Sequence, residues 1–214
     1  MTAAPPSDKL YPSPPADTQP TWEIAYLFPA QGQWSEAEYM ALRPNRHVEF
    51  TDGVVEVLPM PTYSHQKILR YLLRVLEAFA LARQVGEVMF APLRVQLRAG
   101  KFREPDIVFM LAKNLARCGE EFWVGADLVM EIVGADERSR ERDLEKKRAD
   151  YAEGSIPEYW IVDPLEERIT VLRLEGQQYQ VHGEFGRGAQ ATSALLTGFS
   201  VDVSAVLDAG ARAA

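Results

Sequence analysis

The stretch 128–133, Leu128-Val129-Met130-Glu131-Ile132-Val133, places one carboxylate inside an apolar run. Apolar residues on both sides of the run predict a strand that is covered on both faces, as in the interior of an α/β sheet. Burial of an unpaired carboxylate there costs several kcal/mol, so Glu131 needs a metal ion or a cationic partner. A glutamate at the strand end that reaches water or a structural arginine is the alternative that this residue alone leaves open.

A second carboxylate, Asp106, follows Pro105 at the start of another apolar strand, predicted over 105–111. Proline is tolerated there because the first residue of a strand need not donate to the ladder. Asp106 alone could be a strand-start cap that bonds backbone amides. If its strand neighbours that of Glu131, however, the two carboxylates repel each other unless a cation lies between them. A magnesium ion held by one or two carboxylates, water and phosphate oxygens is the usual solution.

The charged segment 139–153 predicts a helix. The spacing of Leu144, Lys147 and Tyr151 places the lysine on a face with two residues that should pack inward. Three charged neighbours are assigned to a different, solvated face: Asp143, Lys146 and Asp150. An inward lysine beside two carboxylates would be a cation aimed at an anionic substrate. A surface lysine whose stem covers apolar neighbours is the commoner alternative, so only the three residues together indicate a site.

The remaining periodicity predicts short strands mixed with two further helices. A capping box of Ser35 and Glu38 begins the first helix, and Asp52-Gly53 is a strong hairpin turn signal. The expected helices are 36–42 and 63–84, and the expected strands are 48–58 (a hairpin), 87–97, 158–162, 168–174 and 178–182. The stretch 194–207 is weakly patterned. Because strands and helices mix without strict alternation, we predict a mixed α+β fold, an α/β class with a central mixed sheet flanked by helices.

Composition narrows the class of protein further. The 214 residues are 47% hydrophobic and 25% charged, as in a soluble globular protein with one ordinary domain. The net charge of −8 argues against nucleic-acid binding by bulk electrostatics, so any such binding must rest on a local site. No apolar stretch approaches the length of a membrane span, and we expect no membrane association.

Seven of the 14 prolines lie in the first 29 residues. Proline fixes φ and removes a backbone donor, so we predict a flexible or docking arm over 1–29, a domain over 30–207 and a tail over 208–214. Cys118 is the single cysteine, which excludes an intrachain disulfide. The start of the chain carries no charged-then-apolar signal pattern. We therefore expect a cytoplasmic location.

The order of these residues resembles the pattern of the PD-(D/E)XK nuclease superfamily: Pro105-Asp106 comes first, then Glu131 on the next buried strand, and then Lys147 on the following helix. More closely, the chain is similar to the Uma-type family of restriction-endonuclease-like proteins over about 35–207. The ordered string of motifs carries this resemblance: 49–53 (EFTDG), 59–65 (PMPTYSH), 103–107 (REPDI), 127–133 (DLVMEIV), 143–147 (DLEKK) and 158–164 (EYWIVDP).

Two departures from the family pattern lie beside the expected site. The superfamily usually places a lysine two residues after the acidic ligand, where this chain has Val133, and the resembling family supplies the lysine from the next helix, as Lys147 would. Gly134-Ala135-Asp136 stands where the family usually has a Ser-Pro pair. This second departure affects the local geometry of the loop but removes no expected ligand.

The resemblance implies a restriction-endonuclease-like core and a metal-dependent phosphodiesterase that cuts DNA. Asp106 and Glu131 would hold Mg²⁺ or Mn²⁺, helped by the backbone carbonyl of Ile132, and the ion would activate a water molecule. Lys147 would orient that water or neutralise the growing charge. Glu49 and His65 match family positions and are secondary candidates for the metal sphere or for proton transfer. A homodimer is expected, because cutting both strands of a duplex needs two sites related by a two-fold axis.

Two other functions stay open at this point. One is a catalytically idle nuclease fold used as a binding or regulatory module, and the other is a hydrolase acting on RNA or nucleotides. Two basic clusters could follow a phosphate backbone: 138–148, with Arg138, Arg140, Arg142, Lys146, Lys147 and Arg148, and 94–103, with Arg94, Arg98, Lys101 and Arg103. The first alternates with glutamates, which favours a solvated face laced with ion pairs for all of its residues except Lys147. No phosphate-binding glycine loop is present.

Overall fold

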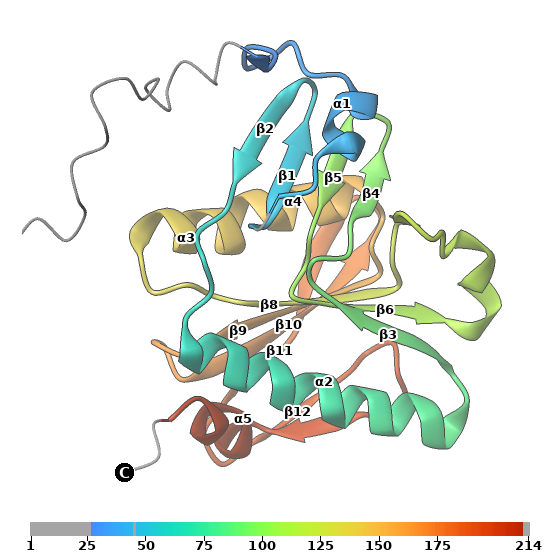
Figure 1. The fold of residues 1–214 in the computed structure, drawn as a ribbon. Coiled ribbons are helices and arrows are strands. Elements are labelled where there is room, and N and C mark those ends of the chain that lie inside the picture. The colour runs from blue at the N-terminus through green and yellow to red at the C-terminus, as the bar shows by residue number, and fades with distance from the viewer. Residues whose placement is uncertain (1–26, 45, 212–214) are drawn as a thin grey trace, which may run out of the picture.

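The computed structural model describes residues 27–44 and 46–211, so most of the predicted arm lies outside the described residues. The centre of the fold is a six-stranded mixed sheet in the order β11-β10-β9-β8-β6-β3 (Figure 1). Its strands are β3 (Gly86–Phe90), β6 (Ile107–Leu111), β8 (Leu128–Ile132), β9 (Glu158–Asp163), β10 (Arg168–Glu175) and β11 (Gln178–Gly186). The pair β8–β9 is parallel and the other neighbours are antiparallel.

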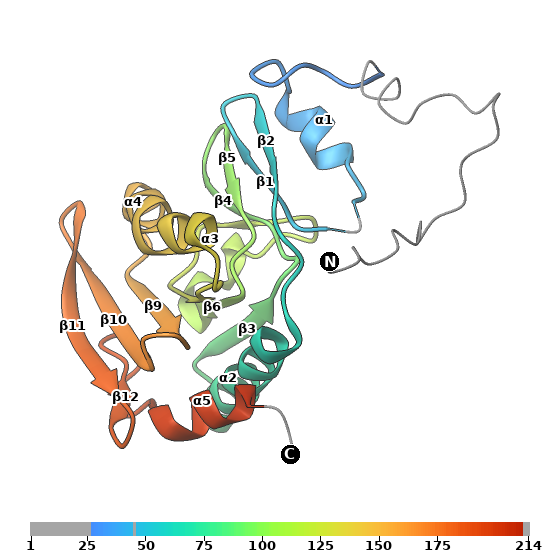
Figure 2. The same cartoon turned by 90° about the vertical axis from the view of Figure 1, so that its left-hand side faces the viewer.

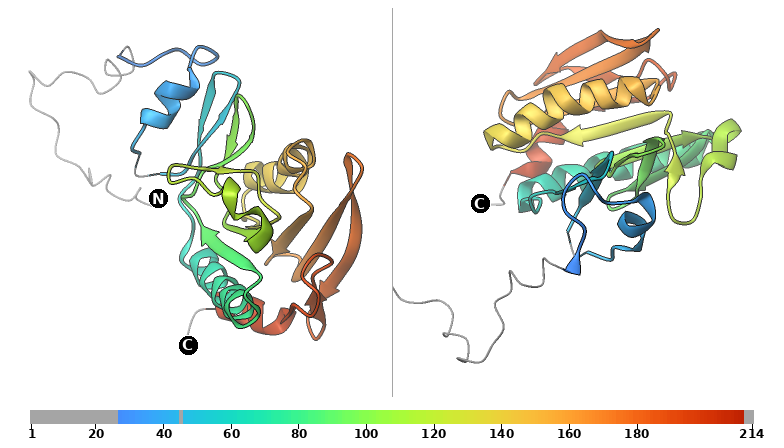
Figure 3. Two further views of the ribbon diagram at one scale, coloured as in Figure 1. Left: turned by 90° about the vertical axis from the view of Figure 1, so that its right-hand side faces the viewer. Right: turned by 90° about the horizontal axis from the view of Figure 1, so that it is seen from above.

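Helices cover both faces of this sheet. The parallel pair β8–β9 requires a crossover, which consists of α3 (Glu137–Glu141), a π-helical turn (Arg142–Lys146) and α4 (Lys147–Glu153). The other face is covered by α2 (Tyr63–Arg83) and α5 (Val203–Gly210). Figures 2 and 3 show α2 and α5 on one side of the sheet and α4 on the other. The predicted central mixed sheet flanked by helices is confirmed.

The alternation of side chains along β8 decides which residues meet which helix layer. Leu128, Met130 and Ile132 pack in the same core cluster as α2, whereas Val129 and Val133 pack in the cluster of α4. Successive side chains of a strand point to opposite faces, so Glu131 shares the α4 face. The run 128–133 is therefore buried on both sides, as its apolar pattern predicts.

A second, five-stranded sheet has the order β2-β1-β5-β4-β7. Its strands are β1 (Val48–Thr51), β2 (Val54–Val57), β4 (Val95–Arg98), β5 (Lys101–Arg103) and β7 (Trp123–Val124). Asp52 and Gly53 both have positive φ, 45° and 84°, which confirms the predicted tight hairpin turn. Next to this sheet lies α1 (Glu36–Ala41), which begins with the predicted Ser35–Glu38 capping box. Tyr39, from α1, packs with Phe50 and Phe102 in a separate small core.

The prediction of one strand over 87–97 is wrong. The chain forms β3 and β4 there, and these strands belong to different sheets. Pro92 lies between them, and proline lacks the N–H that a continuous ladder needs.

The weakly patterned end of the chain forms β12 (Gln190–Thr192) with β13 (Ser200–Asp202) and then α5, which continues to Gly210. A 3₁₀ helix, η2 (Ala112–Arg117), follows β6. Within the described ranges, no helix is both long and apolar enough to cross a membrane.

The packing of α2 on the sheet gives a first testable prediction. Leu72 is fully buried in the core, whereas Leu81 of the same helix is 71% exposed. Leu72→Ala removes buried methyl groups and leaves a cavity, so we expect a free energy of unfolding lower by about 2–5 kcal/mol. The matched control Leu81→Ala should change it by less than about 0.5 kcal/mol. Chemical denaturation of both variants measures the difference, and equal effects would contradict the assigned packing.

Candidate functional site

The register of β6 and β8 brings two carboxylates opposite each other. Ile107 pairs with Met130, and the same antiparallel register continued by one residue sets Asp106 opposite Glu131. Directly opposite residues of such a pair have Cβ atoms about 4.5–5.5 Å apart. Both residues are buried, at 7% and 3% exposure. The two apolar strands are thus neighbours, and their acids meet in a poorly solvated place.

Lys147 lies at the centre of these acids. Its Nζ donates to Glu131 Oε1 at 2.7 Å. It lies 3.5 Å from Glu49 Oε1 and 3.7 Å from Asp143 Oδ1. The Tyr151 hydroxyl donates to the same oxygen of Glu131. The predicted inward orientation of Lys147 is confirmed, and one ammonium group serves three carboxylates.

The prediction that Asp143 belongs to a solvated face is wrong. Asp143 is 2% exposed and lies on the Lys147 side of the crossover helix. The two residues are four positions apart, and this spacing puts side chains on one helical face. Asp143 lies within the π-helical turn over Arg142–Lys146, and Lys147 directly follows it; such turns are frequent at functional sites. Arg142 Nε donates to Asp143 Oδ1 at 3.0 Å. Lys146, by contrast, is exposed as predicted and pairs with Glu141.

Glu49 enters the site from β1 of the second sheet and is 3% exposed. Its Oε2 lies 3.5 Å from Arg103 Nε, and Arg103 Nη2 in turn donates to Asp150 Oδ2 at 2.6 Å. Lys101 Nζ donates to Asp150 Oδ1 at 2.8 Å. Asp150 was also predicted on the solvated face, and this is wrong because it is held between two cations of β5. This network fastens α4, and with it Lys147, to the second sheet.

Asp106 is held by two donors from different elements. The backbone N–H of Ile132 donates to Asp106 Oδ2 at 2.8 Å, and His65 Nε2 lies 3.0 Å from the same oxygen. His65 stands in the first turn of α2, where Thr62 Oγ1 accepts from its backbone N–H. Its Nδ1 is buried and has no hydrogen-bond partner among the described residues. Burial acts to lower the pKa of His65, but the hydrogen bond and charge of Asp106 outweigh it, and the pKa is raised.

Burial shifts the pKa values of the two central residues of this cluster, Glu131 and Lys147. Burial, reinforced by the charges of Asp106 and Asp143, raises the pKa of Glu131 from 4.5 to about 8, although Lys147 opposes this shift. Burial acts to lower the pKa of Lys147, but the charges of Glu131, Glu49 and Asp143 outweigh it and raise the pKa above its usual value. Lys147 therefore stays protonated at neutral pH, while Glu131 resists ionisation.

Three residues of this site were not predicted from the sequence as site residues: His47, Glu104 and Asp143. Glu104 is 4% exposed, its Oε2 accepts from Val48 N at 3.2 Å, and burial raises its pKa to about 7. His47 is half-buried, and burial lowers its pKa. The four-residue spacing from Lys147 was a signal for Asp143. Glu104 and His47 carry no comparable signal, because their burial depends on how the two sheets meet.

A cleft of about 390 Å³ opens onto these groups. Its floor carries Asp106, Glu131, Asp143 and Lys147, and its rim includes residues 58–62, the loop 133–136 and Pro164-Leu165. Its lining includes residues at the beginning of α2 and of α3, two helices that can be located in Figure 2. The loop 133–136 contains the Gly-Ala-Asp departure from the family pattern. A Cβ at Gly134 would lie 2.7 Å from Ser139 Cβ, so glycine allows the close approach of α3.

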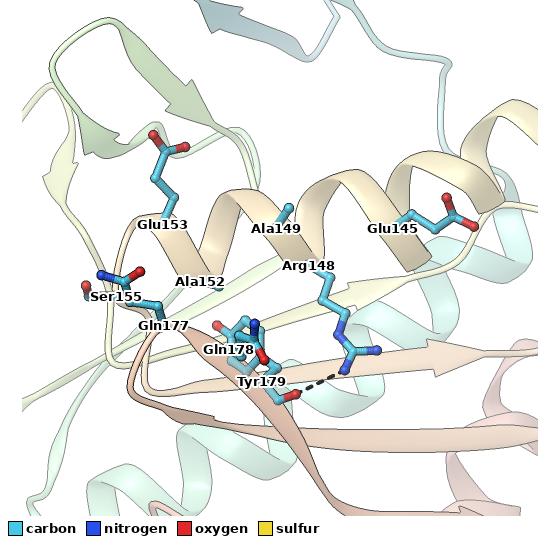
Figure 4. Close-up of a pocket in the computed structure, with 9 residues that line it drawn as sticks. All are labelled: Glu145, Arg148, Ala149, Ala152, Glu153, Ser155, Gln177, Gln178 and Tyr179. Carbon is cyan, nitrogen blue, oxygen red and sulfur yellow. Dashed lines mark hydrogen bonds between the residues drawn. The ribbon is translucent and has the colours of Figure 1, made fainter.

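A larger cleft of about 640 Å³ lies elsewhere, between α4 and the start of β11 (Figure 4). Arg148 from α4 reaches across it and donates through Nη2 to the backbone oxygen of Tyr179 at 3.1 Å. The rest of its lining is supplied mainly by exposed polar side chains and alanines of α4 and by Gln177 and Gln178. The buried acids and Lys147 open onto the smaller cleft instead, so the smaller cleft is the candidate site.

Most cations of the two predicted basic clusters are already engaged. Their partners are carboxylates at 3.3 Å or less in these pairs: Arg98–Asp52, Lys101–Asp150, Arg103–Asp150, Arg138–Glu56, Arg140–Asp163, Arg142–Asp143 and Lys146–Glu141. The interpretation of the crossover helix as a face laced with ion pairs is therefore confirmed for Arg138, Arg140 and Lys146. The pair Arg142–Asp143 is buried, and Arg148 donates to the backbone oxygen of Tyr179 instead. The cluster over 94–103 is bound in the same way and offers little free charge to a phosphate backbone.

The donors of the cleft suit a hard divalent cation. Asp106 and Glu131 face each other across β6 and β8, and both offer carboxylate oxygens to the cleft. The described part of the chain contains no group of three or more His, Cys, Asp or Glu side chains placed to hold a metal ion. Mg²⁺ does not need such a cage, because it uses one or two carboxylates and keeps several waters. The residues present therefore fit such an ion.

The mixed sheet, its crossover helix and the acidic cleft define a restriction-endonuclease-like protein. Residues 34–204 match the Uma2 family, described as "Putative restriction endonuclease", and the chain belongs to this family. The expected family resemblance is confirmed.

Among solved structures, the chain is similar to a protein from Anabaena variabilis ATCC 29413, titled a putative nuclease belonging to DUF820. The TM-score is 0.69 at 17% sequence identity, and the match covers 83% of this chain and 99% of the other. This likeness shows a shared fold. No curated protein matches the chain.

Proposed function

We propose that this protein is a metal-dependent endonuclease that hydrolyses phosphodiester bonds in DNA. One observation carries the proposal: Asp106 and Glu131 face each other on the floor of a cleft, with Lys147 Nζ at 2.7 Å from Glu131. Membership of the Uma2 family supports nuclease activity. The choice of DNA rests on the family description as a restriction endonuclease. The metal and the residue roles are inferred from the site.

Asp106 and Glu131 would hold Mg²⁺ or Mn²⁺. When bound, such an ion lowers the pKa of a water molecule and stabilises charge on the attacked phosphate. Asp106 is prepared for this role, because Ile132 N and His65 fix one oxygen of its carboxylate. Glu131 would exchange part of its hydrogen bonding with Lys147 for the ion, whose charge would also lower its raised pKa.

Lys147 acts as a hydrogen-bond donor and a positive charge, because its raised pKa keeps it protonated. Its ammonium group orients the attacking water or neutralises charge that develops on the phosphate. Glu49 and Asp143 keep that charge in place, since both lie within 3.7 Å of Nζ. Glu49 is a positioning residue in this scheme, and His65 positions Asp106.

Cutting a duplex also requires a second site. A homodimer with a two-fold axis would present one cleft to each strand, since the two strands of DNA run in opposite directions. We propose this assembly together with the activity. Sedimentation of the protein with and without duplex DNA measures it directly, and a monomer in both conditions would contradict it.

The proposal predicts that divalent metal stabilises the folded protein. A ligand at 100 times its Kd adds about 2.7 kcal/mol, which raises the Tm of a domain of this size by roughly 5–11 °C. Thermal unfolding in millimolar MgCl₂ or MnCl₂ measures the shift, with Asp106→Asn as the control and KCl matching the ionic strength. A wild-type Tm that does not move would favour the idle binding module.

The activity itself is tested by conversion of supercoiled plasmid to nicked and linear forms. We expect conversion with Mg²⁺ or Mn²⁺ and none with EDTA. Without the ion, the carboxylates of Asp106 and Glu131 would repel the phosphate, and no water molecule would be activated. A matched assay with a single-stranded RNA of similar charge separates DNA from RNA hydrolysis. Cleavage of RNA alone would overturn the choice of DNA but keep the hydrolytic site.

A further inference from the structure

The exposed face of α2 carries three cations in one row. Lys67, Arg70 and Arg74 are three and four residues apart, so they lie on one side of the helix. Arg70 and Arg74 are exposed, and Lys67 is half-buried and donates to the backbone oxygen of Ala211 at 2.6 Å. We call these residues the α2 stripe. Glu77 is the single acidic residue of this 21-residue helix.

The α2 stripe differs from the other basic clusters in its lack of acidic partners. Within the described residues, no carboxylate lies within ion-pair distance of any of the three cations. Asp208 lines the same groove but is occupied by Arg187, whose Nη1 donates to it at 2.7 Å. In a chain of net charge −8, this leaves a local row of uncompensated positive charge.

The stripe borders a groove on the same helix that begins at the candidate site. The groove between α2 and α5 has a volume of about 560 Å³, and all three cations line it. The first two turns of α2 contribute Ser64, His65 and Ile68 to the cleft of the candidate site. Figures 1 and 2 show α2 running from that side of the molecule with α5 beside it. The cleft and the stripe are thus carried by the same helix, and Lys67 of the stripe directly precedes Ile68 of the cleft in the sequence.

We propose that the α2 stripe binds the sugar-phosphate backbone of a nucleic acid whose scissile bond lies in the cleft. Arginine presents a planar fork that matches phosphate oxygens. Four residues of helix advance by about 6 Å, so Arg70 and Arg74 can reach different phosphates of one strand. The inference rests on the proposed nuclease function and adds the path of the substrate. It also resolves how an acidic protein can hold DNA, because the charge is local.

The test is the salt dependence of binding to a fluorescein-labelled 30-base-pair DNA duplex, measured by anisotropy without divalent metal. Each lost phosphate contact lowers the slope of log K against log salt by about 0.9. For the triple variant Lys67→Gln, Arg70→Gln, Arg74→Gln we expect a slope smaller by about 2.7 and an affinity at least tenfold weaker in low salt. A charge-retaining variant, Arg70→Lys with Arg74→Lys, should keep most of the slope.

A matched control removes three cations that already have acidic partners. This control is the triple variant Lys146→Gln, Arg168→Gln, Arg173→Gln, which also removes three positive charges. In the wild type these cations pair with Glu141, Glu184 and Glu175. We expect its slope to equal that of the wild type. Equal losses in both triple variants would overturn the proposal, because net charge alone would then explain binding. An unchanged slope in the α2 variant would also overturn it.

Failure of this inference can be separated from failure of the proposed function. Hydrolysis of bis(p-nitrophenyl) phosphate with Mn²⁺ needs the cleft but no nucleic-acid backbone. If the wild type hydrolyses this small diester but does not bind the duplex, the α2 stripe has another task and the hydrolytic site stands. If duplex binding depends on the stripe but the diester is stable, the path of the nucleic acid stands without the chemistry. Unfolding midpoints equal to that of the wild type confirm that each variant is folded.

Discussion

Glu131→Gln should abolish metal-dependent cleavage while leaving the fold intact. The amide keeps an oxygen for Lys147 and Tyr151 but loses the negative charge that would hold the ion. Without metal, burial raises the pKa of Glu131 to about 8, so the neutral glutamine resembles the protonated acid of the wild type at pH 7. We expect plasmid nicking to fall by at least about 10²-fold and the free energy of unfolding to change by no more than about 1 kcal/mol.

The same variant has a defined pH signature in EDTA. The folded-state pKa of Glu131 is raised from 4.5 to about 8, so its contribution to stability is present at low pH and is lost as the pH rises through about 8. Wild type should therefore lose stability relative to Glu131→Gln between about pH 5 and pH 8.5. Urea unfolding at both pH values measures this loss. Parallel curves for the two proteins would contradict the account of Glu131.

Lys147→Met should damage both stability and activity. The variant leaves three buried carboxylates without their shared cation, since Glu131, Glu49 and Asp143 all lie within 3.7 Å of Nζ. Removing one partner of a buried ion pair costs about 3–5 kcal/mol. Loss of one preorganised donor to a developing charge lowers the rate by about 10²–10³-fold. Denaturation without metal and nicking with saturating Mn²⁺ measure the two effects.

Added metal separates the two roles of Lys147. If an ion binds among the acids, millimolar Mn²⁺ should restore more stability to Lys147→Met than it adds to the wild type, because the variant has more uncompensated negative charge. Activity should not return, since the ammonium group is still missing. The control Lys147→Arg keeps the positive charge but changes the shape of the side chain. It tests whether a positive charge at this buried position is enough for activity. Full activity of Lys147→Met would remove the lysine from the mechanism.

The main features of the site could be predicted from the sequence because each has a local signal. An acid inside an apolar run, as at Glu131, shows by itself that a charge is buried. Asp106 stands at the start of a second apolar run, and that run predicts a second buried strand. The inward side of Lys147 follows from its spacing to Tyr151. These signals depend on periodicities of two and 3.6 residues, which the chain itself displays.

Other features depend on contacts between distant segments. The break between β3 and β4 sends the chain from one sheet to the other. Asp150 meets Arg103 only because α4 packs against β5 of the second sheet, and Glu104 is held by Val48 and Arg94, which are distant in the sequence. Asp143 resembled a surface residue in a charged helix, although its four-residue spacing from Lys147 was available. The stripe on α2 is a similar case: its cations are visible in the sequence, but their lack of acidic partners is a property of the fold.

The proposed chemistry depends on Asp106 and Glu131 holding one divalent ion together. Titration of the protein with Mn²⁺, followed by the loss of the free-ion electron paramagnetic resonance signal, measures this binding. We expect one bound Mn²⁺ per wild-type chain and binding at least about tenfold weaker in both Asp106→Asn and Glu131→Gln. Wild-type affinity in either variant, or no binding by the folded wild type, would overturn the proposed metal site.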